Sequence, residues 1–367
     1  MNSKIFIAIA LMVSTVAGAS ILGFPYVFSQ VGFLTGVATI ILVGIAATLM
    51  TLYLAEMSLN EKKEHLISGF AKKYFGKKGK IFTVIVETFG IYTAIIAYLI
   101  AIGLALSDIF NVDPLIMGSA FFVFAATLIL FRFKRFNKLD TSVAIVKIAI
   151  LLFFIFVFFP TARTENVTQF NMSKVFIPFG IVLFSCLGYN VIPEMKKILG
   201  KQKKKIITAI VGAMAIVATI YILFSYVFVG NLGSHIGEVA VVGLPKFNLL
   251  GDLFVLIAMG VPFIALSDAI KHIYVNDMGL DKRISWFLSA FIPFLIYVYV
   301  KLGFITFLQI SGTYAGGFLG LLTMLMVLKA RKRKGYKRII RGGNLPIYFS
   351  IFIFAVGILY QTLMLMM

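Results

Sequence analysis

Residues 16–25 read Val16-Ala17-Gly18-Ala19-Ser20-Ile21-Leu22-Gly23-Phe24-Pro25, and they interrupt an apolar segment long enough to cross a bilayer. Two glycines, several small residues and a proline make this stretch a poor α-helix. A second interruption, Phe184-Ser185-Cys186-Leu187-Gly188 followed by Pro193, lies inside another apolar segment. Backbone groups that leave a helix in hydrocarbon must find other partners, so the two breaks indicate a binding site near the membrane midplane.

The composition of the 367-residue chain excludes a soluble domain, because 61% of its residues are hydrophobic and only 13% are charged. Soluble proteins carry about 25% charged residues. Apolar runs of about 20 residues, the length that spans the hydrocarbon core, recur along the whole chain. We therefore expect an all-α polytopic membrane protein in a single transmembrane domain over 1–367. The pattern predicts about eleven transmembrane helices, at 4–31, 33–59, 81–107, 114–131, 141–160, 174–199, 206–230, 248–275, 284–301, 304–328 and 345–366.

The net charge of +20 would suit a nucleic-acid partner, but the placement of the basic residues argues against one. Most of the 34 Lys and Arg residues lie at the N-terminus and in alternate loops. Such alternation follows the positive-inside rule and predicts a multi-pass protein of the cell membrane, with its N-terminus cytoplasmic and its C-terminus outside. These basic loops are 62–80, 132–138, 196–205, 271–283 and 329–341.

The sequence offers no catalytic or metal-binding motif. The single cysteine, Cys186, excludes an intramolecular disulfide and any multi-cysteine metal site. The three histidines (His65, His235 and His272) lie far apart in the sequence. We find no phosphate-binding loop, no paired-histidine zinc motif and no nucleophile elbow, so we expect no enzyme activity, no cofactor and no metal.

The positions of the two breaks add a second argument. They open the first and the sixth predicted spans, so each begins a set of five helices, and the two sets cross the membrane in opposite directions. Corresponding breaks in opposed halves are a pointer to the binding site of an inverted-repeat transporter. The repeats would be 1–160 and 174–328, with 345–366 as an extra helix.

A broken membrane helix has the right chemistry for a small zwitterion. The half-helix that begins near Phe24 presents free N–H groups and a positive dipole end to an anionic group. Carbonyls exposed at the end of a preceding half-helix suit an ammonium or a cation. Together they would form a cradle for an amino acid. The alternative is a pair of Gly/Pro kinks packed against neighbouring helices, since both residues are frequent in membrane helices.

Several stretches carry a resemblance to a known family. Residues Gly18 to Tyr26 (GASILGFPY) resemble the first-helix motif of the amino acid–polyamine–organocation superfamily. Within it, the chain most resembles permeases of the aromatic and hydroxy amino acid type and of the amino acid/auxin type. The resemblance implies a leucine-transporter-like fold of five plus five inverted helices and one extra helix. The other matching stretches are YLAE (53–56), YTAIIAYLIAI (92–102), FSCLGYNVIPE (184–194), FIALSD (263–268) and GFITFLQISGTYAGG (303–317).

The resemblance also implies residue roles. Backbone N–H groups of Ser20 and Ile21 would bind a substrate carboxylate, and carbonyls near Phe184, Ser185 and Leu187 would take the ammonium. Phe184 is similar in place to an aromatic gate, while Tyr92, Ile95 and Ile96 would line the side-chain pocket. Each apolar member also fits a core or lipid contact. The full predicted substrate site is Gly18, Ala19, Ser20, Ile21, Gly23, Tyr92, Phe184, Ser185, Cys186, Leu187 and Gly188.

Lys147 is the candidate for ion coupling. It lies within an apolar run, where an ammonium costs at least about 2.5–3.5 kcal/mol on insertion scales. A lysine at that depth can load and release a proton as solvent access alternates. In related permeases a fifth-helix lysine stands where sodium-coupled members bind sodium, which implies a contact with Gly18. The alternatives are a lysine that reaches the cytoplasmic headgroups and a sodium-coupled protein in which Ser267 is a ligand.

Four intramembrane acids have simpler explanations. Asp268 is expected to form a salt bridge with Lys271 or His272 one turn on. Glu87 is either interfacial or paired inside the bundle. Glu56 and Glu194 lie close to cytoplasmic ends and are expected to make gate or loop contacts.

The expected function is secondary active transport of an amino acid, with protons as the coupling ion and sodium as the alternative. A non-transporting membrane sensor or a membrane enzyme on the same helices is a further alternative. The apolar residues around the breaks favour a large apolar or aromatic side chain on the substrate. The sequence decides neither which amino acid is bound nor the oligomeric state.

Overall fold

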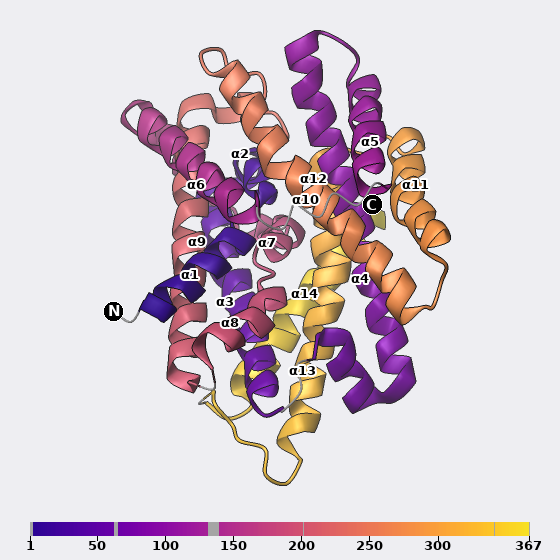
Figure 1. The fold of residues 1–367 in the computed structure, drawn as a ribbon. Helices are drawn as coiled ribbons and strands as arrows, with labels where there is room; N and C mark the ends of the chain where they lie inside the picture. Colours follow the sequence, from indigo (N-terminus) through magenta and orange to yellow (C-terminus); the bar gives the residue numbers. More distant parts are fainter. Residues whose placement is uncertain (1–2, 62–64, 131–138, 201, 341, 367) are drawn as a thin grey trace.

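The computed structural model describes residues 3–61, 65–130, 139–200, 202–340 and 342–366, and every regular element in these ranges is helical (Figure 1). Each of the eleven apolar stretches contains helix. Within the described residues, six helices are long and apolar enough to cross a membrane, or seven when α1 and α2 count as one bent span. The long helices are α3 (Phe33–Leu59), α4 (Ile67–Phe110), α5 (Pro114–Leu130), α6 (Leu139–Phe158), α9 (Lys203–Leu232), α10 (Asn248–Asp277), α11 (Lys282–Tyr299), α13 (Gly317–Arg331) and α14 (Leu345–Met366).

The helices pack in two groups. The α3 group consists of α1 (Ser3–Val16), α2 (Phe24–Val31), α3, α7 (Phe179–Ser185), α8 (Ile192–Leu199) and α9, which contact one another extensively. The α4 group consists of α4, α5, α10 and α11. In Figure 1, α1 and α9 lie on one side of the molecule and α4, α5 and α11 on the other. Helices α12 (Phe304–Ile310) and α13 contact members of both groups.

Both sequence breaks interrupt helices, as expected. α1 ends at Val16, Gly18 is extended (φ −91°, ψ −169°), and the 3₁₀-helix η1 (Ala19–Gly23) leads into α2. In the second break α7 ends at Ser185, and the 3₁₀-helix η6 (Tyr189–Val191) leads into α8. A proline lies in the first turn of each following helix, Pro25 in α2 and Pro193 in α8, where its missing N–H removes no helical hydrogen bond.

Two helices differ from the predicted spans. α4 begins at Ile67 instead of near residue 81, and it bends at Gly76, which has a φ of +69° that favours glycine. The added segment is helical because Phe70, Ala71 and Tyr74 recur at helical spacing and are buried. The predicted span 304–328 is divided into α12, a π-helical turn over Ser311–Gly316 (η8) and α13.

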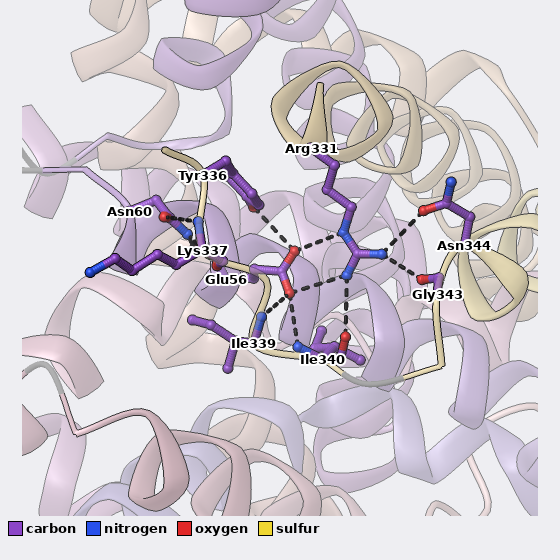
Figure 2. A network of polar contacts seen from close by, with 9 residues as sticks. All are labelled: Glu56, Asn60, Arg331, Tyr336, Lys337, Ile339, Ile340, Gly343 and Asn344. Carbon is purple, nitrogen blue, oxygen red and sulfur yellow. Dashed lines mark hydrogen bonds and ion pairs between the residues drawn. The ribbon is translucent and has the colours of Figure 1, made fainter. Parts of the chain in front are cut away.

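A buried ion pair fixes the 332–344 loop, which joins α13 to α14 (Figure 2). Arg331, at the end of α13, donates from Nε to Oε1 of Glu56 at 3.0 Å and from Nη2 to Oε2 at 3.2 Å. The Glu56 carboxylate, near the end of α3, also accepts the N–H groups of Ile339 and Ile340 at 2.8 and 2.9 Å and the Tyr336 hydroxyl at 3.2 Å. Glu56 therefore makes the loop contacts expected from the sequence, and it ties the loop to α3.

The remaining donors of the pair are also satisfied. Arg331 Nη1 donates to the Gly343 carbonyl at 2.5 Å and to Asn344 Oδ1 at 3.3 Å. Burial, and then the nearby Glu56 carboxylate, raise the pKa of Tyr336 above its usual value, so its hydroxyl stays a donor at neutral pH. The many hydrogen bonds of this pair to the loop specify one loop conformation. Removing either partner would leave the other charge buried without a counter-charge.

We expect Arg331→Met to lower the free energy of unfolding by about 3–5 kcal/mol, because it leaves the Glu56 charge buried without its cation. The two side chains are only 2% and 0% exposed, so water does not replace the lost partner. Denaturant unfolding followed by circular dichroism measures the change. Arg338→Met is the matched control, since Arg338 lies in the same loop and is exposed. Equal stability of the two variants would show that the buried pair does not hold the loop.

Candidate functional site

A cavity of about 720 Å³ separates the two helix groups. Its walls come from α1, η1, α7 and η6 on one side and from α4, α10 and η8 on the other. Both helix breaks therefore face the cavity. Its lining includes Gly18, Ser20, Glu87, Gly90, Ile91, Ala94, Tyr98, Phe184, Ser185, Leu187, Tyr189, Asn190, His272 and Ser311.

The two breaks are joined by hydrogen bonds. Ser185 Oγ lies 2.6 Å from Ser20 Oγ and also donates to the Ile181 carbonyl at 2.7 Å. The Tyr221 hydroxyl, from α9, lies 2.6 Å from the Val16 carbonyl oxygen and 3.0 Å from that of Ser185. Tyr221 is fully buried, and its single O–H is shared between these two carbonyls. The Val16 carbonyl also accepts the Gly18 N–H at 2.6 Å, so the hydroxyl matters most for the Ser185 carbonyl at the end of α7.

The start of η1 supplies hydrogen-bond donors. Ala19 and Ser20 are its first two residues, so their N–H groups have no acceptor within the helix, whereas the i→i+3 pattern pairs the Ile21 N–H, which was also predicted to bind a carboxylate, with the Gly18 carbonyl. No backbone acceptor outside the helices reaches the Ser20 N–H among the described residues. Gly18 and Ser20 line the cavity, which makes this backbone available to an anionic ligand group.

The cavity opens at one end and is closed at the other. Leu66, Asn190 and His272, which belong to its lining, are exposed at the end of the bundle that carries the basic loops, called here the basic end. At the opposite end Leu22 is fully buried, and its carbonyl accepts the Ala240 N–H at 2.9 Å. The segment around Ala240 thus covers the first break from that side.

The pocket residues that were predicted on the third span lie on α4, but on the face next to the one that lines the cavity. Tyr92 does not belong to the cavity lining; its hydroxyl donates to the Leu288 carbonyl of α11 at 2.9 Å and contacts the Tyr274 hydroxyl of α10. Ile95 and Ile96 are buried but also lie off the lining. The residues of α4 that face the cavity are Glu87, Gly90, Ile91, Ala94 and Tyr98, whose spacing of three to four marks one helix face.

The residues predicted at the breaks divide into two sets. Those that line the cavity are Gly18, Ser20, Phe184, Ser185 and Leu187. Ile21 and Cys186 are buried behind it. Gly23 and Gly188 provide close packing, because a Cβ at Gly23 would lie 2.4 Å from the Ile305 side chain and one at Gly188 would lie 2.6 Å from Met12. Ala19 contributes its backbone to η1, and its side chain lies outside the described part of the structure.

The candidate coupling residues lie outside the cavity lining. Lys147 is 8% exposed on α6, a helix that contacts α1, α9 and α10. Ser267 is buried on α10, and its Oγ has no hydrogen-bond partner among the described residues. One turn of α10 carries the expected salt bridge, with Asp268 Oδ2 and His272 Nε2 3.3 Å apart.

Tyr221 is the residue that the sequence reasoning missed. It belongs to the apolar span 206–230, and a tyrosine at mid-span is a signal, because a buried hydroxyl needs a partner. Glu87 was expected to be interfacial or paired, and it lines the cavity opposite the breaks. His272 was expected only as the partner of Asp268, but it is also part of the lining.

We expect Tyr221→Phe to lower the free energy of unfolding by about 1–3 kcal/mol, because it removes the side-chain donor of the buried Ser185 carbonyl and one of the two donors at the Val16 carbonyl. The ring is retained, so packing against Phe24, 4.8 Å away between centroids, is unchanged. Denaturant unfolding measures the loss. Tyr226→Phe on the same helix, where the ring packs against Phe33, is the control. If Tyr221→Phe were as stable as the control, the hydroxyl would not stabilise the breaks.

Comparison with known proteins places this geometry in a family. The model of the tryptophan/tyrosine permease family matches residues 1–362. The chain is 26% identical to the tyrosine-specific transport system 1 of Haemophilus influenzae, over 96% of this chain and 94% of that protein. It is 22% identical to the low affinity tryptophan permease of Escherichia coli K12, over 93% and 91% of the two chains.

A solved structure confirms the fold. The structure of MhsT in complex with L-phenylalanine superimposes with a TM-score of 0.67 and covers 99% of this chain and 98% of its own, at 13% identity. That protein has the leucine-transporter-like fold, which the family resemblance of the sequence implied for this chain. On the match of the family model over nearly its full length, this chain belongs to the tryptophan/tyrosine permease family and is an amino acid transporter, not an enzyme.

Proposed function

We propose that the protein is a secondary active transporter that carries an aromatic amino acid together with a proton. The substrate lies where the two helix breaks meet. The observation that carries this proposal is the link between the breaks, in which Ser20 and Ser185 are hydrogen-bonded at the wall of the central cavity. The N–H groups at the start of η1 bind the substrate carboxylate, and carbonyls near Phe184 and Leu187 receive its ammonium.

The size and lining of the cavity support an aromatic substrate. Its volume of about 720 Å³ is within the range of about 300–1,000 Å³ that is typical of small-molecule sites. Apolar and aromatic side chains from both groups, among them Tyr98, Phe184 and Leu187, surround the space beside the breaks. The related proteins named above as tyrosine and tryptophan transporters point to the same class of substrate.

Alternating access follows from the two helix groups. We place the basic end, with the N-terminus, in the cytoplasm on the positive-inside rule. The cavity then opens inward, and the segment around Ala240 closes the outer side. Residues 1–160 and 174–328 would be inverted repeats, with 345–366 as the extra helix. Rocking of the α3 group against the α4 group would open the outer side.

Lys147 is the residue that we assign to proton coupling. It is nearly buried in α6, next to the broken first span, where a change in solvent access changes its protonation. Sodium coupling is the second candidate, and it rests on one observation. The Ser267 hydroxyl is buried without a hydrogen-bond partner among the described residues, so its oxygen is available to a cation.

Uptake by the purified protein in liposomes tests the proposal. An inward proton gradient should accumulate labelled tryptophan, tyrosine or phenylalanine, and a protonophore should abolish the accumulation. Replacing sodium by choline at constant pH should change nothing, whereas a sodium-coupled protein would lose uptake. A non-transporting sensor would bind the amino acid without accumulating it. Absence of uphill uptake in every ionic condition would refute transport as proposed.

A further inference from the structure

A second polar site lies at the end of the bundle opposite the basic loops, outside the central cavity. Asp108 belongs to the last turn of α4, and Asp252 to the second turn of α10. The Asp252 carboxyl is within hydrogen-bonding reach of the Asp108 carboxyl. Asp252 is 0% exposed, and neither of its oxygens accepts from a protein donor within the described residues. Oδ2 of Asp108 is likewise buried without a partner.

This arrangement requires a positive charge. An ionised carboxylate only accepts hydrogen bonds, so two of them in contact cannot satisfy each other. Two negative charges that share one buried site also repel, and the usual result is that one of the pair retains a proton. A single proton turns one carboxyl into a donor and joins the two side chains. The hydrogen bond then links α4 to α10.

The helices around the pair provide no basic partner for it. α5 contains no charged residue, and the charged residues of α11 are Lys282 and Arg283 in its first turn, at the basic end. α6 carries Asp140 and Lys147 in its first half, η1 is uncharged, and Lys246 and Lys301 are exposed. Asp113 is a further acid that lines the adjacent cavity, and its Oδ1 accepts the Leu115 N–H at 2.8 Å at the start of α5.

A cavity gives the pair access to that side of the membrane. It has a volume of about 450 Å³ and is lined by Asp108, Asp113, Ser107 and Val242, among others. Asn248 adds a further acceptor, since its buried Oδ1 has no partner in the described part of the chain and lies one helical turn before Asp252. Within the described residues no three His, Cys, Asp or Glu side chains come together as a metal site.

We propose that Asp108 and Asp252 form a carboxyl–carboxylate pair that binds one proton, which enters through this cavity from the side opposite the basic loops. The site is separate from Lys147 and from the proposed substrate cradle. It gives the protein a dependence of stability on outside pH. Above about pH 4, where an aspartate of the unfolded chain is ionised, the folded state binds one more proton than the unfolded state. The contribution of the pair to stability is therefore complete below that pH and falls as the pH rises, until the folded state also loses the proton.

Thermal unfolding of the full-length protein in detergent, without sodium and without substrate, tests the site. The melting temperature of the wild type should fall from mild acid to mild alkali. Asp252→Asn should remove this fall, because its amide donates to Asp108 without a titrating proton. Asp113→Asn is the matched control: it lines the same cavity, can still cap α5, and should keep the wild-type pH dependence.

Infrared spectroscopy gives a readout that does not depend on stability or transport. A protonated-carboxyl band should disappear on titration of the wild type and be absent from both Asp252→Asn and Asp108→Asn. A band that persists in both variants, or an Asp252→Asn variant with the wild-type pH slope, would overturn the proposal. The proposal would also be overturned if sodium, but not choline, removed the pH dependence of the wild-type melting temperature, because the site would then hold a metal cation.

Discussion

Gly18→Val is expected to weaken binding of the aromatic amino acid strongly while leaving the protein folded. A Cβ at position 18 would meet only the Val16 carbonyl oxygen, at 3.7 Å, so the folded chain accepts it. The backbone there is extended, a conformation that valine favours. The two methyl groups would instead enter the central cavity beside Ser20, where the substrate carboxylate is proposed to lie. Overpacking of this kind costs about 1–3 kcal/mol, which corresponds to a loss of affinity of about fivefold to 150-fold.

The measurement is a thermal-shift titration with tryptophan, tyrosine and phenylalanine, together with equilibrium binding of the labelled amino acid. Gly44→Val is the matched control. A Cβ at Gly44 meets nothing within 4 Å, and Gly44 lies on α3 outside the cavity lining. The control should bind like the wild type. Unchanged affinity in Gly18→Val, with a normal melting temperature, would show that the substrate does not lie against the first break.

Lys147→Ala is expected to abolish uptake driven by a proton gradient. The variant should still bind substrate, because Lys147 lies outside the cavity lining. It should also fold, since removing an ammonium from mid-span relieves a cost of at least about 2.5–3.5 kcal/mol on insertion scales. Liposome uptake with and without a pH gradient, beside equilibrium binding, separates the two effects.

Two further variants sharpen this test. Lys147→Arg should also lose gradient-driven uptake, because a guanidinium keeps its charge and cannot release a proton. Lys301→Ala, at an exposed position between α11 and α12, should transport normally. Gradient-driven accumulation by Lys147→Ala at the wild-type level would exclude the lysine from coupling. If uptake depended on sodium and not on the proton gradient, sodium coupling with Ser267 as a ligand would be favoured.

The third predicted span shows where sequence reasoning stops. The predicted pocket residues Tyr92, Ile95 and Ile96 are on the correct helix, but the cavity faces Ile91, Ala94 and Tyr98. In a helix that is apolar on all sides, periodicity does not indicate which face meets a neighbour. From the sequence, the hydroxyl of Tyr92 is equally compatible with a pocket and with the contact that it makes with α11. Only packing of α4 against α10 and η8 decides the face.

The sequence alone determined the approximate positions of most helices, the alternation of charge between their ends and the two breaks near Gly18 and Ser185. These properties are local, because hydrocarbon thickness fixes the length of a span and glycine and proline fix where it weakens. The tertiary structure alone decided which groups meet across long separations: Tyr221 with both breaks, Glu56 with Arg331, and Asp108 with Asp252. Such pairs form because a buried polar group must find a partner in three dimensions, and its place along the chain does not say which one.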